Sequence, residues 1–155
     1  MEQRGIVNML KPAGMTSHDG IYFMRKLTGI KRIGHAGTLD PLAVGVLPIF
    51  IGKATRIIEY LEFDDKKYRC EMVLGLTTDT QDIWGTVLKD RRNQGRPISE
   101  QIVQDIFHSF EGKLFQVPPA YSAVRVNGKR LYEYARRGES VEAEPRQVEI
   151  YELRL

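Results

Sequence analysis

Apolar and polar positions along the 155-residue chain predict short strands separated by helices and turns. Two apolar runs, 5–10 and 46–51, are bounded by turn-forming residues, as buried strands usually are. Side chains that alternate between apolar and polar predict strands with one buried face. On these grounds strands are expected at 5–10, 46–51, 66–75, 84–90 and 146–155, and the stretch 117–138 is expected to hold a further strand, a turn and a short helix.

Helical spacing predicts the elements between these strands. Ser17 is a candidate N-cap, and Ile21, Met24 and Leu27 recur every third residue until Gly29, a typical helix end.

Two further helices and one turn are expected. A helix over 53–63 should turn Ile57, Ile58 and Leu61 inward, and Ser99 should cap a helix whose apolar face is Ile102, Val103, Ile106, Phe107 and Phe110. Asp40 and Pro41 are expected to start a single helical turn that ends at Gly45.

Strands outnumber helices in this pattern and interleave with them irregularly. We therefore expect an α/β (α+β) fold, with a mixed, largely antiparallel sheet flanked by helices and loops. The length of 155 residues and a hydrophobic content of 42% fit one globular domain.

Composition excludes several classes of function. Cys70 is the only cysteine, so neither an intrachain disulfide nor a cysteine-rich metal site is expected. The three histidines are scattered, and no metal site is expected from them. No window approaches the roughly 18 apolar residues of a membrane span, and we expect a cytoplasmic protein without a membrane partner. The net charge of +3 is compatible with a polyanionic partner.

The stretch RIGHAGTLDPLAVGVLPIFIGKATR, residues 32–56, is the main candidate for chemistry. Asp40 before Pro41 is a common turn and cap, and spacing alone favours that ordinary role. Gly34 and Gly37, however, bracket His35 just upstream and would let the backbone approach a ligand closely. The same four residues match the Gly-x-x-Gly clamp of KH RNA-binding domains, so a plain RNA-binding loop stays open.

Residues 34–56, GHAGTLDPLAVGVLPIFIGKATR, closely resemble the signature of the TruB-type tRNA pseudouridine-55 synthases. NMLKPAGMTSHD (8–19) is similar to the family's Lys-Pro-x-Gly-x-Thr-Ser segment. The downstream stretches KKYRCEMVLGLTTDTQDIWG and VPPAYSAVRVNGKRLYEYARRG extend the resemblance over essentially the whole chain. It implies a pseudouridine synthase fold and an isomerase that converts the T-loop uridine of tRNA, position 55, to pseudouridine.

The resemblance also implies roles for single residues. Asp40 would be the catalytic carboxylate, acting either on C1′ of the ribose or on the C2′ proton. Tyr68 would stack on the uracil, which must be flipped out of its stack, and His35 would lie near the vacated position. The residues carried over with the motif as further substrate contacts are Gly37, Thr38 and Leu39. The reaction needs neither cofactor nor metal, and none is expected.

Basic residues flank these motifs and are candidates for phosphate contacts, which position RNA without reading its sequence. The first set is Lys11, Lys31, Arg32, Lys53 and Arg56. A second cluster comprises Lys129, Arg130, Arg136 and Arg137.

The chain departs from the family pattern in two ways. Arg125 stands where the family usually has lysine. The family continues into a Gly-Thr-Tyr-Ile-Arg segment, whose arginine pairs with the catalytic aspartate, and then usually into a PUA domain. We therefore expect 1–155 to be a catalytic domain that is incomplete at its C-terminus and lacks the PUA domain. The missing portion of the same protein is expected as a partner, either as a continuation of this chain or as a separate chain.

Two other functions stay open. A non-catalytic RNA-binding or tRNA-folding chaperone module could use the same surface. A nucleoside hydrolase is the weaker alternative, because hydrolysis normally needs two facing carboxylates and the motif supplies only Asp40.

Overall fold

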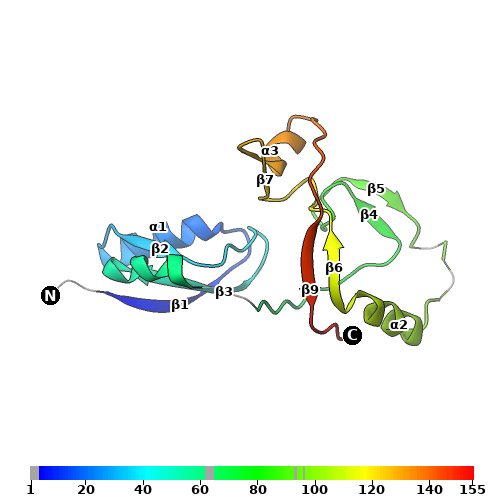
Figure 1. The fold of residues 1–155 in the computed structure, drawn as a ribbon, viewed down its shortest axis with the longest axis horizontal. Coiled ribbons are helices and arrows are strands. Elements are labelled where there is room, and N and C mark those ends of the chain that lie inside the picture. Colours follow the sequence, from blue (N-terminus) through cyan, green and yellow to red (C-terminus); the bar gives the residue numbers. More distant parts are fainter. Residues whose placement is uncertain (1–3, 62–64, 93, 96) are drawn as a thin grey trace. The chain divides into compact units, whose positions relative to one another are not determined.

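The computed structural model describes residues 4–61, 65–92, 94–95 and 97–155. The chain divides into two compact units, Met1–Arg69 and Cys70–Leu155. The elements of the first unit are β1 (Gly5–Lys11), α1 (Ser17–Thr28), β2 (Ile33–His35), β3 (Gly45–Ile51) and the 3-10 helix η1 (Gly52–Tyr60) (Figure 1). The predicted strands at 5–10 and 46–51 are confirmed to within one residue.

The sheet of the first unit has the order β1-β3-β2, and both outer strands run antiparallel to β3. Lys11 at the end of β1 pairs with Gly45 at the start of β3, while His35 at the end of β2 pairs with Ile49. β1 and β2, the latter of which stops opposite Ile49, therefore both run toward the end of the sheet where β3 begins. We call this the loop end of the sheet.

Helix α1 covers one face of this sheet. It begins at Thr16 rather than at the predicted cap Ser17: the Thr16 hydroxyl accepts a hydrogen bond from the Asp19 amide, and the Asp19 carboxylate accepts one from the Thr16 amide. Such a reciprocal pair satisfies two amides that the first turn leaves unpaired. Gly29 ends the helix as predicted, at a φ of 71°.

The core lies between α1 and the strands. Its buried members are Ile21, Met24, Ile33, Leu47, Ile49 and Ile51. Leu27 was predicted to join this stripe but is 68% exposed. At 3.6 residues per turn, each three-residue step falls about 60° short of a full turn, so the third position has rotated away from the sheet.

The segment after β3 is a 3-10 helix, where an α-helix over 53–63 was predicted; its last two residues, 62 and 63, lie outside the described residues. Ile58 is half-buried and faces Gly34, whereas Ile57 and Leu61 are exposed. In a 3-10 helix side chains repeat every third residue, so Thr55 and Ile58 share a face and Ile57 is turned outward. Thr55 and Ile58 both lie over Gly34, on the sheet face that also carries Phe50.

The predicted strand at 66–75 is wrong. Residues 65–73 have no regular secondary structure, and every residue in 65–75 is exposed. Alternation by itself makes no strand, because the backbone amides and carbonyls need a neighbouring strand to bond with. Among the described residues, none pairs with this segment.

The second unit is built from short antiparallel pairs. Its elements are β4 (Leu76–Thr78), β5 (Val87–Asp90), α2 (Glu100–Phe110), β6 (Gly112–Gln116), β7 (Arg125–Val126), β8 (Lys129–Arg130), α3 (Leu131–Ala135) and β9 (Arg146–Ile150). The pairs are β4-β5, β6-β9 and β7-β8. The predicted strands at 84–90 and 146–155 are confirmed over part of their length, and the strand, turn and short helix expected in 117–138 are present.

Ser99 caps α2 as predicted, accepting a hydrogen bond from the Ile102 amide at 3.4 Å. Its apolar face is only partly covered: Val103 and Phe107 are half-buried, while Ile106 is 49% exposed. None of the described residues of α2 is fully buried.

The α/β fold with antiparallel pairing is confirmed for the described residues. No helix in the described part of the chain has the length and apolar character needed to cross a membrane.

Candidate active site

The connection between β2 and β3, residues 36–44, carries Asp40 and joins β3 at the loop end of the sheet. The Ala36 amide donates to the Pro48 carbonyl at 3.1 Å, which extends the pairing of the two strands by one residue. The connection between β1 and α1, residues 12–16, leaves the sheet at the same end. The Gly14 amide joins the two connections by donating to the Pro41 carbonyl at 2.9 Å.

Asp40 itself begins a tight turn. The Ala43 amide donates to the Asp40 carbonyl at 3.1 Å, and no helical turn forms among residues 40–45, in contrast to the prediction. The Asp40 residue is exposed, and no hydrogen bond or ion pair within the described part of the chain reaches its carboxylate. The loop backbone is thus held while the carboxylate is open to a ligand.

Lys11 holds one side of this loop. Its side chain is fully buried, and Nζ donates to the carbonyls of Pro12 at 2.9 Å, Met15 at 2.7 Å and Pro41 at 3.1 Å. An ammonium has three donors, and all three are used here. The expectation that Lys11 contacts phosphate is therefore corrected: a buried charge needs internal partners, and this one ties β1 and the following turn to the Asp40 loop.

Ser17 holds the other side of the loop. Its Oγ donates to the Leu39 carbonyl at 3.1 Å and accepts from the Leu39 amide at 3.0 Å. This role was not predicted from the sequence, because Ser17 was expected to cap the helix. Thr16, three residues before Asp19, was the sequence signal for the true cap. With the cap assigned to Thr16, the Ser17 hydroxyl would have needed another partner.

His35 ends β2 opposite Ile49 and is half-buried. Its Nδ1 is buried without a hydrogen-bond partner among the described residues. Burial lowers the pKa of the His35 imidazole below its usual value, and electrostatic repulsion from His18 on α1 lowers it further. The neutral ring is favoured, and it can accept or donate a hydrogen bond.

The other residues carried over with the motif have different surroundings. Gly37 has a φ of 71°, a conformation that side chains other than glycine rarely adopt. Thr38 is exposed, whereas the Leu39 side chain packs against the α1 core. Tyr68 is 74% exposed on the irregular segment after η1, and no hydrogen bond or ring contact of the described residues joins it to the Asp40 loop.

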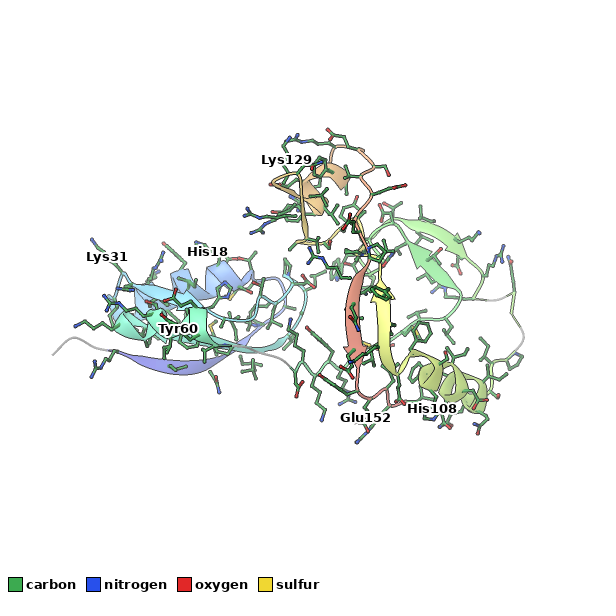
Figure 2. The ribbon with its side chains drawn as sticks, viewed as in Figure 1. His18, Lys31, Tyr60, His108, Lys129 and Glu152 are labelled. Carbon is green, nitrogen blue, oxygen red and sulfur yellow. The ribbon has the colours of Figure 1, made fainter. Side chains whose placement is uncertain are left out.

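The remaining basic candidates lie near the end of the sheet opposite the loop end. Lys31 and Arg32 precede β2, and η1, with Lys53 and Arg56, follows β3 (Figure 2 labels Lys31). Arg32 Nε donates to Thr55 Oγ1 at 2.7 Å, so the two segments are in contact. A seven-residue strand is about 20 Å long, so these side chains are grouped well away from Asp40.

In the second unit, arginine and lysine side chains lie against tyrosine rings. The Arg136 Cζ is 5.2 Å and the Arg130 Cζ 5.9 Å from the centre of the Tyr132 ring. Lys129, labelled in Figure 2, has its Nζ 5.8 Å from the centre of the Tyr134 ring. These contacts restrict the cations and keep them at the surface.

Comparison with known proteins gives the family of this chain. The family model described as TruB family pseudouridylate synthase (N terminal domain) matches residues 25–155. The tRNA pseudouridine synthase B of Moorella thermoacetica is 54% identical over 151 residues, covering 97% of this chain and 49% of the relative. That of Streptococcus agalactiae serotype III is 53% identical over 150 residues, covering 97% of this chain and 51% of the relative.

A solved structure is also similar. A chain from the crystal structure of a Cbf5-Nop10-Gar1 complex aligns with a TM-score of 0.52 and 28% identity, covering 78% of this chain and 31% of its own length. This chain spans about half the length of the curated relatives that it matches. The matched family model covers most of the sequence, including the Asp40 loop, and the chain belongs to the TruB family of pseudouridylate synthases, to whose N-terminal domain it corresponds.

Proposed function

We propose that the protein containing this chain isomerises a uridine of RNA to pseudouridine, with Asp40 as the catalytic carboxylate. The observation that carries the proposal is the Asp40 loop: its backbone is bonded on both sides of Asp40, while the carboxylate is exposed and has no partner in the described residues. Membership of the TruB family supports the reaction type. The relatives' name, tRNA pseudouridine synthase B, supports tRNA as the substrate, and we take the T-loop uridine at position 55 as the target.

The reaction breaks the bond between C1′ of the ribose and N1 of uracil and forms a bond from C1′ to C5. The C5 proton is lost and N1 gains one, so no group is added or removed overall. The Asp40 carboxylate can serve either by attacking C1′ or by taking the C2′ proton and returning it. In both routes it must be held at a fixed place beside the ribose, as a fixed loop allows.

A uridine in a structured loop must be flipped out to reach the carboxylate. We assign the stacking role to Tyr68, because its ring is exposed and can cover a uracil face. His35 is assigned to the neighbourhood of the extruded base, because its neutral ring has an Nδ1 without a partner among the described residues and it directly precedes the connection that carries Asp40. Gly37, Thr38 and Leu39 are assigned as further substrate contacts through the exposed part of the loop.

Phosphate contacts are assigned to two groups of basic side chains. The first, Lys31, Arg32, Lys53 and Arg56, lies about 20 Å from the loop end and would bind the RNA several nucleotides from the target. The second is the tyrosine-supported cluster of Lys129, Arg130, Arg136 and Arg137. We also propose that an arginine outside these 155 residues pairs with Asp40, since no cation among the described residues does so, and that the protein acts in the cytoplasm.

A non-catalytic RNA-binding or tRNA-folding module is the second candidate. It is favoured by one observation: the basic group of the first unit, at the start of β2 and in η1, lies apart from Asp40, so it could bind RNA whether or not the carboxylate reacts.

The test is Asp40→Asn in the complete native protein, with binding of tRNA and formation of pseudouridine measured on the same preparations. Asparagine is about as good at a turn or cap as aspartate, so stability should change by less than about 1 kcal/mol. A neutral amide can neither attack C1′ nor accept the C2′ proton, so turnover should fall by several orders of magnitude with tRNA binding retained.

Nucleoside analysis of the product separates the alternatives. Pseudouridine from the native protein supports the proposal, unchanged RNA that stays bound supports the binding module, and released uracil indicates a hydrolase. Full turnover by the asparagine variant would remove Asp40 from the mechanism.

A further inference from the structure

Ser17 is a buried serine whose hydroxyl makes both of its hydrogen bonds with one other residue. It is 4% exposed, and its Oγ both donates to the Leu39 carbonyl and accepts from the Leu39 amide, at 3.1 and 3.0 Å. Ser17 and Leu39 are 22 positions apart in the sequence. A buried hydroxyl costs free energy unless it is hydrogen-bonded, and here the compensating partner is the backbone just before Asp40.

The hydroxyl is not needed by the helix on which it lies. Thr16 already caps α1 through its reciprocal bonds with Asp19. Ser17, the first helical residue, points its hydroxyl at the loop instead. The local structure of α1 therefore does not account for a serine at this position.

The two bonds fix both ends of the Leu39 backbone. The Leu39 carbonyl belongs to the peptide plane that carries the Asp40 amide, so a fixed carbonyl restricts the direction in which Asp40 leaves the chain. On the other side, the Pro41 carbonyl is held by Lys11 Nζ and the Gly14 amide. Asp40, whose carboxylate has no partner among the described residues, thus lies between two anchored neighbours.

We propose that Ser17 is a positioning residue for Asp40, acting through the backbone of Leu39; this inference rests on the proposed function. Removing the Ser17 hydroxyl should leave the Asp40 carboxylate chemically intact but increase the mobility of the Asp40 loop. Misplacement of a reacting group by about 1 Å can cost on the order of a hundredfold in rate. The loss should appear in the chemical step, because Ser17 is buried and its hydroxyl is already bonded to Leu39, so it is not available to bind RNA.

The experiment compares Ser17→Ala with Thr16→Ala in the complete native protein. Thr16→Ala is the matched control, since it weakens the same helix end by removing the cap and leaves Leu39 untouched. Single-turnover pseudouridine formation at saturating tRNA, tRNA binding, and hydrogen exchange of the Leu39 amide are measured for each. Ser17→Cys serves as a second variant, because a thiol is close in size and a weak hydrogen-bond partner.

For Ser17→Ala we expect turnover about ten- to a hundredfold lower, tRNA affinity within about threefold of the native value, and faster exchange at Leu39. Thr16→Ala should keep the native turnover and Leu39 exchange. If Ser17→Ala fails to fold, Ser17→Cys should show the same loss of turnover with binding retained.

Other outcomes overturn the inference. Native turnover in a folded Ser17→Ala or Ser17→Cys variant would reduce Ser17 to a packing residue. Equal losses in Ser17→Ala and Thr16→Ala would trace the effect to the helix end. A native protein that forms no pseudouridine would instead refute the proposed function, and the positioning role of Ser17 with it, so the two failures are distinguishable.

Discussion

At the scale of single residues, the buried ammonium of Lys11 is the most unusual feature of the first unit. A lysine is almost never fully buried unless it is paired, and here its partners are three backbone carbonyls without a carboxylate. Two of these carbonyls, Pro12 and Met15, belong to the turn after β1, and the third, Pro41, belongs to the Asp40 loop. The side chain therefore joins two connections that the sequence separates by about thirty residues.

Lys11→Met tests this role. Methionine has a similar length and fills the same space, but it leaves the Pro12 and Met15 carbonyls without their bonds. An unsatisfied buried group costs about 1 to 3 kcal/mol; because Pro12 is exposed and its carbonyl can bond to water, we count the half-buried Met15 alone and expect the free energy of unfolding to fall by about 1 to 3 kcal/mol, measured by urea denaturation. Lys31→Met, on an exposed lysine, is the control and should change stability by less than about 0.5 kcal/mol. An equally small effect at Lys11 would contradict the anchoring role.

At the scale of secondary structure, the contact between η1 and β2 depends on a missing side chain. A Cβ built on Gly34 would lie 2.9 Å from Cδ1 of Ile58, closer than carbon atoms normally approach. The glycine thus lets the 3-10 helix lie directly on the strand that ends in His35. The atom that blocks a larger residue is the tip of a flexible side chain, which makes the cost of substitution moderate.

The prediction is a double-mutant cycle. Gly34→Ala should destabilise the protein by about 1 to 2 kcal/mol through overpacking against Ile58. Ile58→Val removes the blocking Cδ1, so in that background Gly34→Ala should cost at least about 0.5 kcal/mol less. Thermal and denaturant unfolding of the four proteins give the coupling energy. Strict additivity would show that the two residues do not meet as described.

The helices and strands show which structural features can be predicted from the sequence and which cannot. Strands such as β3 carry their signal in a local apolar run, and Gly29 ends α1 through its own backbone preference, so both could be predicted. The segment 66–75 alternates like a strand, but pairing is decided by what lies beside it, which local pattern does not record. Lys11 was misassigned for the same reason: its charge predicts exposure, whereas its burial depends on carbonyls of the next turn and of the distant Asp40 loop that surround the side chain. Asp40 could be found because its motif is local, whereas its anchor Ser17 lies 23 positions away.

At the scale of the whole molecule, the basic side chains around the start of β2 lie apart from the candidate catalytic residue Asp40. The net charge is only +3, but several basic side chains gather where β2 begins and η1 follows β3, at the sheet end away from Asp40. If RNA binds as proposed, these cations act on its phosphates, while the loop end acts on the target uridine. Binding and turnover should therefore respond to different substitutions.

The salt dependence of binding tests this division. Each phosphate contact adds about 0.7 to 0.9 to the slope of log affinity against log salt concentration, so the double variant Lys31→Gln/Arg56→Gln should lower the slope by roughly 1.4 to 1.8. Its turnover at saturating tRNA should stay within about twofold of the native value, because neither side chain lies near Asp40. Lys89→Gln, on an exposed lysine of β5 that is assigned no RNA contact, is the matched control and should leave the slope unchanged. Both quantities come from binding titrations at several salt concentrations and from single-turnover assays on the same proteins.

An unchanged slope in the double variant would remove this end of the sheet from the RNA-binding surface and leave the tyrosine-supported cluster of the second unit as the remaining candidate. A large loss of turnover with the slope unchanged would contradict the separation of the two ends.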